Sequence, residues 1–430
     1  MVRLVALILL AAGSLAAQAI DGTALLIRIR QHVRESIVDV PNYTCLETMD
    51  RTTTGPKGHE EFRERLRVEV LVADHKELFA WPGSTDFADA DFGNADFGNA
   101  DFGNSMVDWI DAGAIGTGNF WTDLHNVFVA SGTSVSYAGL AGVDKSLYRF
   151  DFHVPSLSSR YILSIAGKTA TTAYSGSFWV DRNSLDLVRL DTRAEDIPPD
   201  LDCREESTSA TYGRVSLGGK ERLLASASEL EIVDRNSYRS HNAVVFTGCR
   251  HYGAVSSLSF DDRPASSTTR EGARKELKLP ADVTLALKMD GPITMEESAA
   301  GDEIVAVLDK PVKSGDILLA KGTRVLGRIR RLERYSRARQ FGSPGAMTMV
   351  ALEFYAVDSR EGLIRFKARL TGPVAMATER ISRLRGPEFT TGEEGLDIVD
   401  DGASSGVGRF RVPGKNLRLA RGFRTLWKTE

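Results

Sequence analysis

Residue types that build metal and redox centres are scarce in this sequence. It contains three cysteines and seven histidines among 430 residues. No two cysteines form a Cys-x-x-Cys pair and no histidine stands at ligand spacing from a cysteine, so we expect neither a metal site nor a cofactor. Uncharged apolar runs of about 20 residues, the length that spans a bilayer, are also missing, and we expect no transmembrane segment in the mature chain.

Motifs that mark common enzyme classes are missing as well. The sequence has no His-Glu-x-x-His, no Gly-x-Ser-x-Gly, no phosphate-binding loop and no Gly-x-Gly-x-x-Gly after a strand. In the nearest case, residues 59–63, Arg63 stands where a zinc site needs its second histidine. We therefore expect a non-enzymatic protein without catalytic residues, and keep a hydrolase with carboxylates scattered along the sequence as the minor alternative.

The first nineteen residues have the pattern of a secretory signal peptide. Arg3 supplies the positive charge, residues 4–12 form a short apolar segment, and residues 17–19 match an Ala-x-Ala cleavage site. We therefore predict removal of residues 1–19 and export to the periplasm or the extracellular space.

The three cysteines predict a covalent cross-link in an exported chain. An oxidising compartment favours one disulfide and one free thiol among Cys45, Cys203 and Cys249. Their spacing does not show which two residues pair, so the pairing stays open.

Charge is distributed unevenly, although the formal net charge is only −4. Residues 1–262 carry 24 Lys and Arg against 36 Asp and Glu, net −12, whereas residues 263–430 carry 30 against 22, net +8. Residues 255–276, rich in Ser and Thr, have the composition of a linker. We therefore predict one domain at residues 20–254 and a second at residues 277–430.

Hydrophobic periodicity predicts a mainly β (α+β) fold with few helices. The expected order in the first domain is a helix, three strands, two short helices and a long antiparallel meander, at residues 21–40, 43–47, 66–72, 77–81, 106–112, 120–130 and 133–252. The meander includes three strands after Phe178-Trp179-Val180. In the second domain we expect strands at residues 283–287, 304–308, 318–319, 325–329, 347–357, 363–370, 418–419 and 426–427. Its residues 385–405, rich in Gly, Glu, Asp, Thr and Ser, predict a mobile loop.

A five-residue repeat interrupts the first domain at residues 85–105. Ala-Asp-Phe-Gly-Asn occurs three times in succession, at residues 90–104. It resembles the pentapeptide-repeat pattern, but a coil of that kind needs several stacked turns to bury a core. We interpret the segment as a lengthened loop, with a calcium-binding row of aspartates as the alternative.

Arginines are concentrated in one stretch of the second domain. We predict that they form a basic surface, which consists of Arg324, Arg328, Arg330, Arg331 and Arg334. Guanidinium groups suit phosphate, but an exposed strand pair with a charged outer face explains the run more simply. Because no aromatic residues alternate with these arginines and the chain is exported, we expect no nucleic-acid partner.

The order of elements in the first domain, with the run Ser-Gly-Ser-Phe-Trp-Val-Asp at residues 175–181, resembles the LolA/RseB-type fold. The resemblance implies an antiparallel half-barrel covered by helices, in a family whose members carry lipoprotein acyl chains or sense envelope components. A strongly curved sheet has an inner face too wide to fill itself, which leaves room for an acyl chain. Our candidates for the lining of such a cavity are Phe79, Trp81, Phe150, Phe152 and Trp179.

The second domain resembles the TrbI-like β-barrel of secretion channels. The resemblance lies in residues 301–307, 310–312 and 317–327, where buried alternating segments and Gly-containing turns follow one another. It implies a small β-barrel that acts as a non-catalytic assembly or binding module. The inner-membrane helix and proline-rich stalk of the channel proteins are missing here. The pairing of both domains also resembles uncharacterised exported bacterial proteins.

These features predict an exported, non-enzymatic cell-envelope protein. We expect the half-barrel to bind a lipid or acylated ligand, possible partners being a lipid, an acylated protein or another envelope component. We expect the basic second domain to dock on a partner or on an envelope surface. The alternative is a structural or adhesive cell-surface protein whose half-barrel is filled by its own side chains and binds no ligand.

Overall fold

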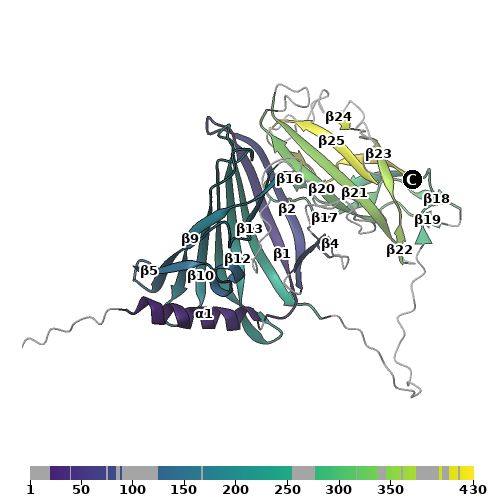
Figure 1. Ribbon diagram of the computed structural model, residues 1–430. Coiled ribbons are helices and arrows are strands. Elements are labelled where there is room, and N and C mark those ends of the chain that lie inside the picture. Colours follow the sequence, from purple (N-terminus) through teal and green to yellow (C-terminus); the bar gives the residue numbers. More distant parts are fainter. Residues whose placement is uncertain are drawn as a thin grey trace, which may run out of the picture.

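Strands dominate the protein, as the sequence predicts (Figure 1). The computed structural model describes residues 20–38, 40–73, 76–83, 88–89, 124–165, 168–253, 277–315, 317–337, 345–359, 362–373, 397–399, 406–414 and 417–430. The predicted signal peptide, the linker, the helix at residues 106–112, and most of the repeat and of the loop at residues 385–405 lie outside the described residues.

The first half of the chain forms one antiparallel sheet, which we call the N-terminal sheet. Its strand order is β4-β3-β2-β1-β13-β12-β11-β10-β9-β6-β5. The strands are β1 (Tyr43–Thr54), β2 (Glu60–Ala73), β3 (Lys76–Ala80), β4 (Ala88–Asp89), β5 (Ser134–Ala141), β6 (Leu147–Val154), β9 (Ala173–Asp181), β10 (Leu187–Glu195), β11 (Glu205–Leu217), β12 (Lys220–Val233) and β13 (Arg239–His251). A separate hairpin consists of β7 (Ile162–Ile165) and β8 (Lys168–Thr171).

The meander has four strands after β9, where the sequence analysis expected three. The missed boundary is the turn between β11 and β12, which consists of Gly218 and Gly219 alone. Both glycines have positive φ values, 58° and 81°, a conformation that side chains disfavour and that tight hairpins need. Two residues are too short a break to separate two strands in a hydrophobicity pattern.

One α-helix, α1 (Gly22–Val38), lies across the end of the N-terminal sheet (Figure 1). Asp21 caps it, because its Oδ1 accepts hydrogen bonds from the backbone N–H groups of Thr23 and Ala24. A five-residue π-helical turn, η2 (His125–Val129), packs against α1 and falls in the second predicted helical segment.

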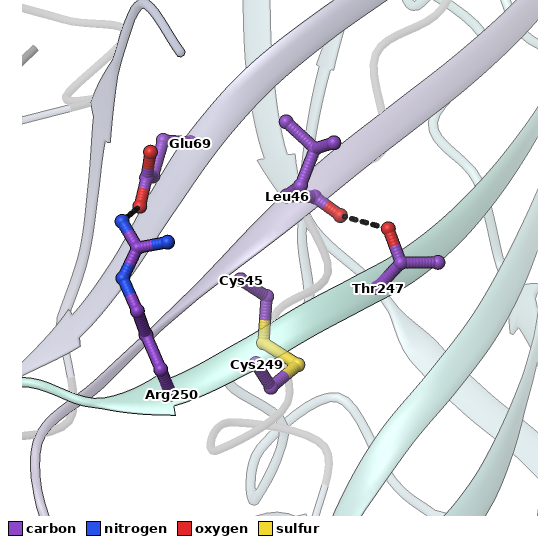
Figure 2. Close-up of a disulfide and its surroundings, with 6 residues drawn as sticks. All are labelled: Cys45, Leu46, Glu69, Thr247, Cys249 and Arg250. Carbon is purple, nitrogen blue, oxygen red and sulfur yellow. Dashed lines mark hydrogen bonds and ion pairs between the residues drawn. A yellow bond between two sulfur atoms is a disulfide. The ribbon is translucent and has the colours of Figure 1, made fainter. Parts of the chain in front are cut away.

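The N-terminal sheet is cross-linked between β1 and β13. Cys45 and Cys249 form a disulfide (Figure 2), and Cys203 is a buried free cysteine, which confirms the predicted one disulfide and one thiol. The disulfide lies where the β1–β13 register shifts, between Thr44 and Leu46. It joins two positions 204 residues apart in the sequence.

The second half of the chain forms a sheet that we call the C-terminal sheet. Its principal strand order is β14-β22-β21-β20-β17-β15-β27-β23, with β25 and then β24 attached to β21. The strands of this half are β14 (Leu277–Lys278), β15 (Thr284–Met289), β16 (Ile293–Thr294), β17 (Glu303–Leu308), β18 (Val312–Ser314), β19 (Ile317–Leu319), β20 (Arg324–Tyr335), β21 (Met347–Ser359), β22 (Gly362–Arg365), β23 (Ala368–Pro373), β24 (Asp397–Val399), β25 (Val407–Pro413), β26 (Arg418–Leu419) and β27 (Arg424–Thr429). Trp427 and Phe354 are fully buried in its core.

The two sheets are hydrogen-bonded to each other along β2. The start of β2 pairs with β20, with Phe62 opposite Tyr335. Further along, Ala300 exchanges backbone hydrogen bonds with Arg65 and Arg67, and the end of β2 pairs with β3. The free edge of β2 is therefore covered in three successive stretches, two of which come from the second half of the chain.

Gly301 allows this close contact. Its φ is +100°, and a Cβ atom at this position would lie 2.0 Å from the carbonyl oxygen of Arg67. We expect Gly301→Ala to destabilise the protein by about 2–3 kcal/mol more than Gly322→Ala. Gly322 is the matched control, because its φ is +86° but no atom lies within 4 Å of its added Cβ. Urea unfolding of both variants checks this, and equal losses would contradict it.

Removing the disulfide should lower stability strongly, because the unfolded chain then loses a constraint on a very long loop. We expect the double variant Cys45→Ala, Cys249→Ala to lose about 2–5 kcal/mol. Cys203→Ala, which removes only a buried thiol, should cost about 1 kcal/mol. Denaturant unfolding with and without reductant measures the stability of both variants. If the reductant leaves the unfolding midpoint of the wild type unchanged, the disulfide does not stabilise the protein.

Candidate functional site

The candidate site lies on the face of the N-terminal sheet that packs against α1, which we call the inner face. Side chains alternate between the two faces of a strand, so cross-strand partners share a face. Leu190, Phe178 and Phe150 are such partners on β10, β9 and β6, and they form one apolar cluster with Ile29 and Val33 of α1. The inner face is therefore apolar where the helix covers it.

Two of the predicted lining residues, Phe150 and Phe152, belong to this cluster under α1. Phe150 stacks on Phe178 with ring centroids 5.1 Å apart, and Phe128 of η2 meets Phe178 edge-on at 4.9 Å. Both phenylalanines are almost fully buried. The structure thus brings Phe150 and Phe152 together on the inner face, beneath the helix.

Two others, Phe79 and Trp81, belong to a second apolar cluster on the other half of the sheet. This cluster is built mainly from β1, β2, β3 and β13, with Leu217 of β11, Leu224 of β12 and Ala300, and it includes Met49, Val68 and Val244. No residue of α1 or η2 contributes to it among the residues that the structure describes. The apolar inner face therefore extends beyond the area that α1 covers.

The fifth predicted residue, Trp179, points to the opposite, outer face, because its neighbours Phe178 and Val180 are the buried ones on β9. It lies between two guanidinium groups, with Arg149 5.7 Å and Arg189 5.5 Å from its ring. Both arginines also form ion pairs, with Asp151 and Asp191. Trp179 thus lies among ion pairs on the outer face, whereas the other four predicted lining residues lie on the inner face.

The five predicted arginines do not form one open surface. The side chains of Arg328, Arg330, Arg331 and Arg334 are only 11–17% exposed, and Arg324 alone is 57% exposed. The reason is β20, which continues past the C-terminal sheet to pair with β2. Docking of a partner by this segment stays a prediction.

Three of these arginines face the N-terminal half. Arg330 and Arg328 lie 4.9 Å and 5.5 Å from the ring of Trp81, and Arg328 also donates a hydrogen bond to the carbonyl of Pro82. Arg334 forms an ion pair with Glu60 of β2. Cation–π contacts and ion pairs in a partly desolvated contact hold the two sheets together.

A buried ionic group lies at the junction of β2 and β20. Arg51 pairs with Glu64 on one side, and Glu333 accepts from Tyr335 and pairs with Arg331 on the other. The two carboxylates stand opposite each other in the register, and two arginines neutralise them. Buried charges need such pairing, so this part of the inner face carries no net charge.

Sequence reasoning missed Glu47, which is fully buried on the inner face between Cys45 and Met49 of β1. Neither carboxyl oxygen has a hydrogen-bond partner among the described residues. Burial raises the pKa of Glu47 to about 8, so the carboxyl is mostly uncharged at neutral pH. A glutamate at a position where strand alternation demands an apolar side chain is the signal that identifies it.

Polar contacts hold the C-terminal half of α1 in place. Asp186, in the turn between β9 and β10, lies 2.9 Å from Nε2 of His32 and 2.8 Å from the guanidinium of Arg214. Burial opposes ionisation of Asp186, but hydrogen bonds from Arg214 and His32 outweigh it and lower the pKa of the carboxyl. Arg34 donates to the carbonyls of Phe128 and Val129 in η2.

Within the described ranges, no group of three or more His, Cys, Asp or Glu side chains is arranged to hold a metal ion. No helix in the same ranges is long and apolar enough to cross a membrane.

Comparison with known proteins places this chain in no family and finds a weak structural likeness. No family profile matches the sequence, and no curated protein matches it. The fold has a distant similarity to a DUF1329 family protein from Desulfovibrio piger, with a TM-score of 0.27 and 13% identity over 56% of this chain and 96% of that chain. A likeness at this level supports no conclusion about fold or function.

Glu47 should make stability depend on pH. The native carboxyl, with its raised pKa, binds a proton more tightly than the unfolded one at the ordinary 4.5, so the unfolded state releases that proton and stability falls as pH rises from about 4.5 to 8. Relative to Glu47→Gln, the wild type should lose up to about 1.4 kcal/mol per pH unit in this window.

Urea unfolding at pH 5, 6, 7 and 8 measures the difference. Glu221→Gln is the control, because that side chain is exposed and its removal should leave the pH profile unchanged. Parallel profiles for wild type and Glu47→Gln would contradict the prediction.

Proposed function

We propose that this chain is an exported, non-enzymatic protein of the cell envelope that binds a lipid or acylated ligand on the inner face of its N-terminal sheet. The observation that carries the proposal is the size of the apolar inner face. Its second cluster, on β1, β2, β3 and β13, extends past the helix that packs on the first. The side chains of both clusters are buried, and a broad apolar inner face of this kind favours an apolar guest.

Two further features support this proposal. The signal-like first nineteen residues and the Cys45–Cys249 disulfide both fit an oxidising compartment outside the cytoplasm. The resemblance of the first half to the LolA/RseB-type fold adds the expectation of an acyl chain as the guest.

In this proposal the C-terminal sheet docks on a partner or an envelope surface. Because the side chains of the other four arginines on β20 are only 11–17% exposed, docking falls to the exposed basic side chains of the β18–β20 region. These are Lys313, Lys321 and Arg324. Long-range attraction to an anionic surface needs exposed charge of this kind.

Two adjacent residues of β13 provide a matched test of ligand binding. Val244 is buried on the inner face, whereas Val245 is 49% exposed on the outer face. We expect Val244→Trp to fill the space that an acyl chain occupies and to weaken binding of a fluorescent acyl probe about tenfold, while Val245→Trp binds like the wild type. Circular dichroism verifies that both variants fold.

Native mass spectrometry of the wild type, released gently from the periplasm, gives the independent readout. We expect a co-purifying mass that organic solvent removes. A wild type that carries no lipid and binds no acyl probe would favour the alternative, a structural or adhesive protein. Digestion of intact cells by added protease would then support exposure on the cell surface.

A further inference from the structure

A row of polar side chains crosses the inner face beside the apolar one. Cross-strand register places Glu64, Arg51, Asn242, Leu230, Thr208 and Thr192 side by side on β2, β1, β13, β12, β11 and β10. We call this the polar row. The neighbouring row, two residues along each strand, is Leu66, Met49, Val244, Ser228, Ala210, Leu190, Phe178 and Phe150. The two rows are about 7 Å apart.

The polar row contains hydrogen-bonding groups that the described part of the chain leaves unused. Asn242 is fully buried, and neither its Oδ1 nor its Nδ2 has a partner there. The hydroxyl of Thr192, 4% exposed, is also without a partner in those residues. Burying an amide or hydroxyl without a hydrogen bond costs free energy, and a leucine or valine at either position would avoid that cost.

The ionisable groups of this region already have partners. Arg51 is neutralised by Glu64 at the end of the row, and Thr208 donates to Glu206, which also accepts from the hydroxyl of Tyr161. No cation is left over on the row for an anionic group. The unused groups, the amide of Asn242 and the hydroxyl of Thr192 at the β10 end of the row, are complementary to groups that are polar but uncharged.

We propose that the polar row binds the uncharged, hydrogen-bonding head of an amphipathic ligand, and that the apolar row holds its acyl chain. Ester or amide carbonyls and hydroxyls, as in an acylglycerol, have the matching chemistry. This inference rests on the proposed function and adds the ligand class to it. An ionised carboxylate or phosphate would be buried here without a counter-charge, which is strongly unfavourable.

Two probes with the same chain separate these cases. Monomyristoylglycerol has an uncharged head, and myristate an ionised one. By isothermal titration at pH 7, we expect the wild type to bind the glyceride at least about tenfold more tightly than the fatty acid. Equal affinities would overturn the inference and leave the proposed function standing, whereas a wild type that binds neither probe would refute the proposed function itself.

Asn242→Leu tests the residue directly with two readouts. Because the variant removes unpaired polar atoms, the ligand-free protein should keep or raise its melting temperature, while its affinity for monomyristoylglycerol falls about tenfold. Thr192→Val, nearly isosteric, should show the same pattern with a smaller loss. Thr48→Val, on the outer face of β1 beside Glu47, is the control and should change neither quantity.

A purely structural asparagine gives the opposite pattern. If Asn242→Leu lowers the melting temperature and binds the glyceride as tightly as the wild type, the polar row serves the fold and the inference is wrong.

Discussion

The pairing of β1 with β13 is the constraint on which the rest of the structure depends. β1 lies inside the N-terminal sheet, with β2 on one side and β13 on the other, so it joins strands separated by most of the first half of the chain. The entropy lost in closing such a long loop grows only slowly with length, and the Cys45–Cys249 disulfide reduces that loss further. The same pairing places Asn242 opposite Arg51 and Phe246 opposite Glu47. The inner face exists because this one ladder forms.

The edge of β2 explains the run of arginines on β20. An uncovered edge strand is a template for unwanted pairing, and here β20, Ala300 and β3 cover it in succession. Where β20 approaches β2, it lies beside Trp81 and several carboxylates. Its arginines form cation–π contacts with Trp81 and ion pairs with the carboxylates. A run that reads as a basic surface in the sequence is therefore the cationic side of an internal contact. The close fit at Gly301 belongs to the same contact.

Local pattern predicted the elements well and their partners poorly. The helix expected at residues 21–40 and the strands expected at residues 66–72 and 347–357 rest on short-range patterns, and each is present in the structure. Alternation also shows that Phe178 and Trp179 lie on opposite faces of β9, but it does not show which face is the inner one. The sequence analysis therefore placed Trp179 in the cavity lining together with Phe150 and Phe152. The burial of Arg328, and of Glu47 without a hydrogen-bond partner in the described residues, depends on the pairing of strands that are far apart in the sequence. A local sequence pattern contains no information about such pairing.

The two faces of the N-terminal sheet follow different rules of polar satisfaction. On the outer face, charged groups pair with one another across neighbouring positions, as Arg149 does with Asp151 and Arg189 with Asp191, and their side chains are 31–49% exposed to solvent. On the inner face, Arg51 is paired, yet Glu47 and Asn242 are buried without a partner in the described residues. Buried polar groups are normally satisfied, so a sheet selected for stability alone would replace both by apolar side chains. Under the proposed function, both residues serve the binding of a ligand, although their burial without a partner costs folding free energy.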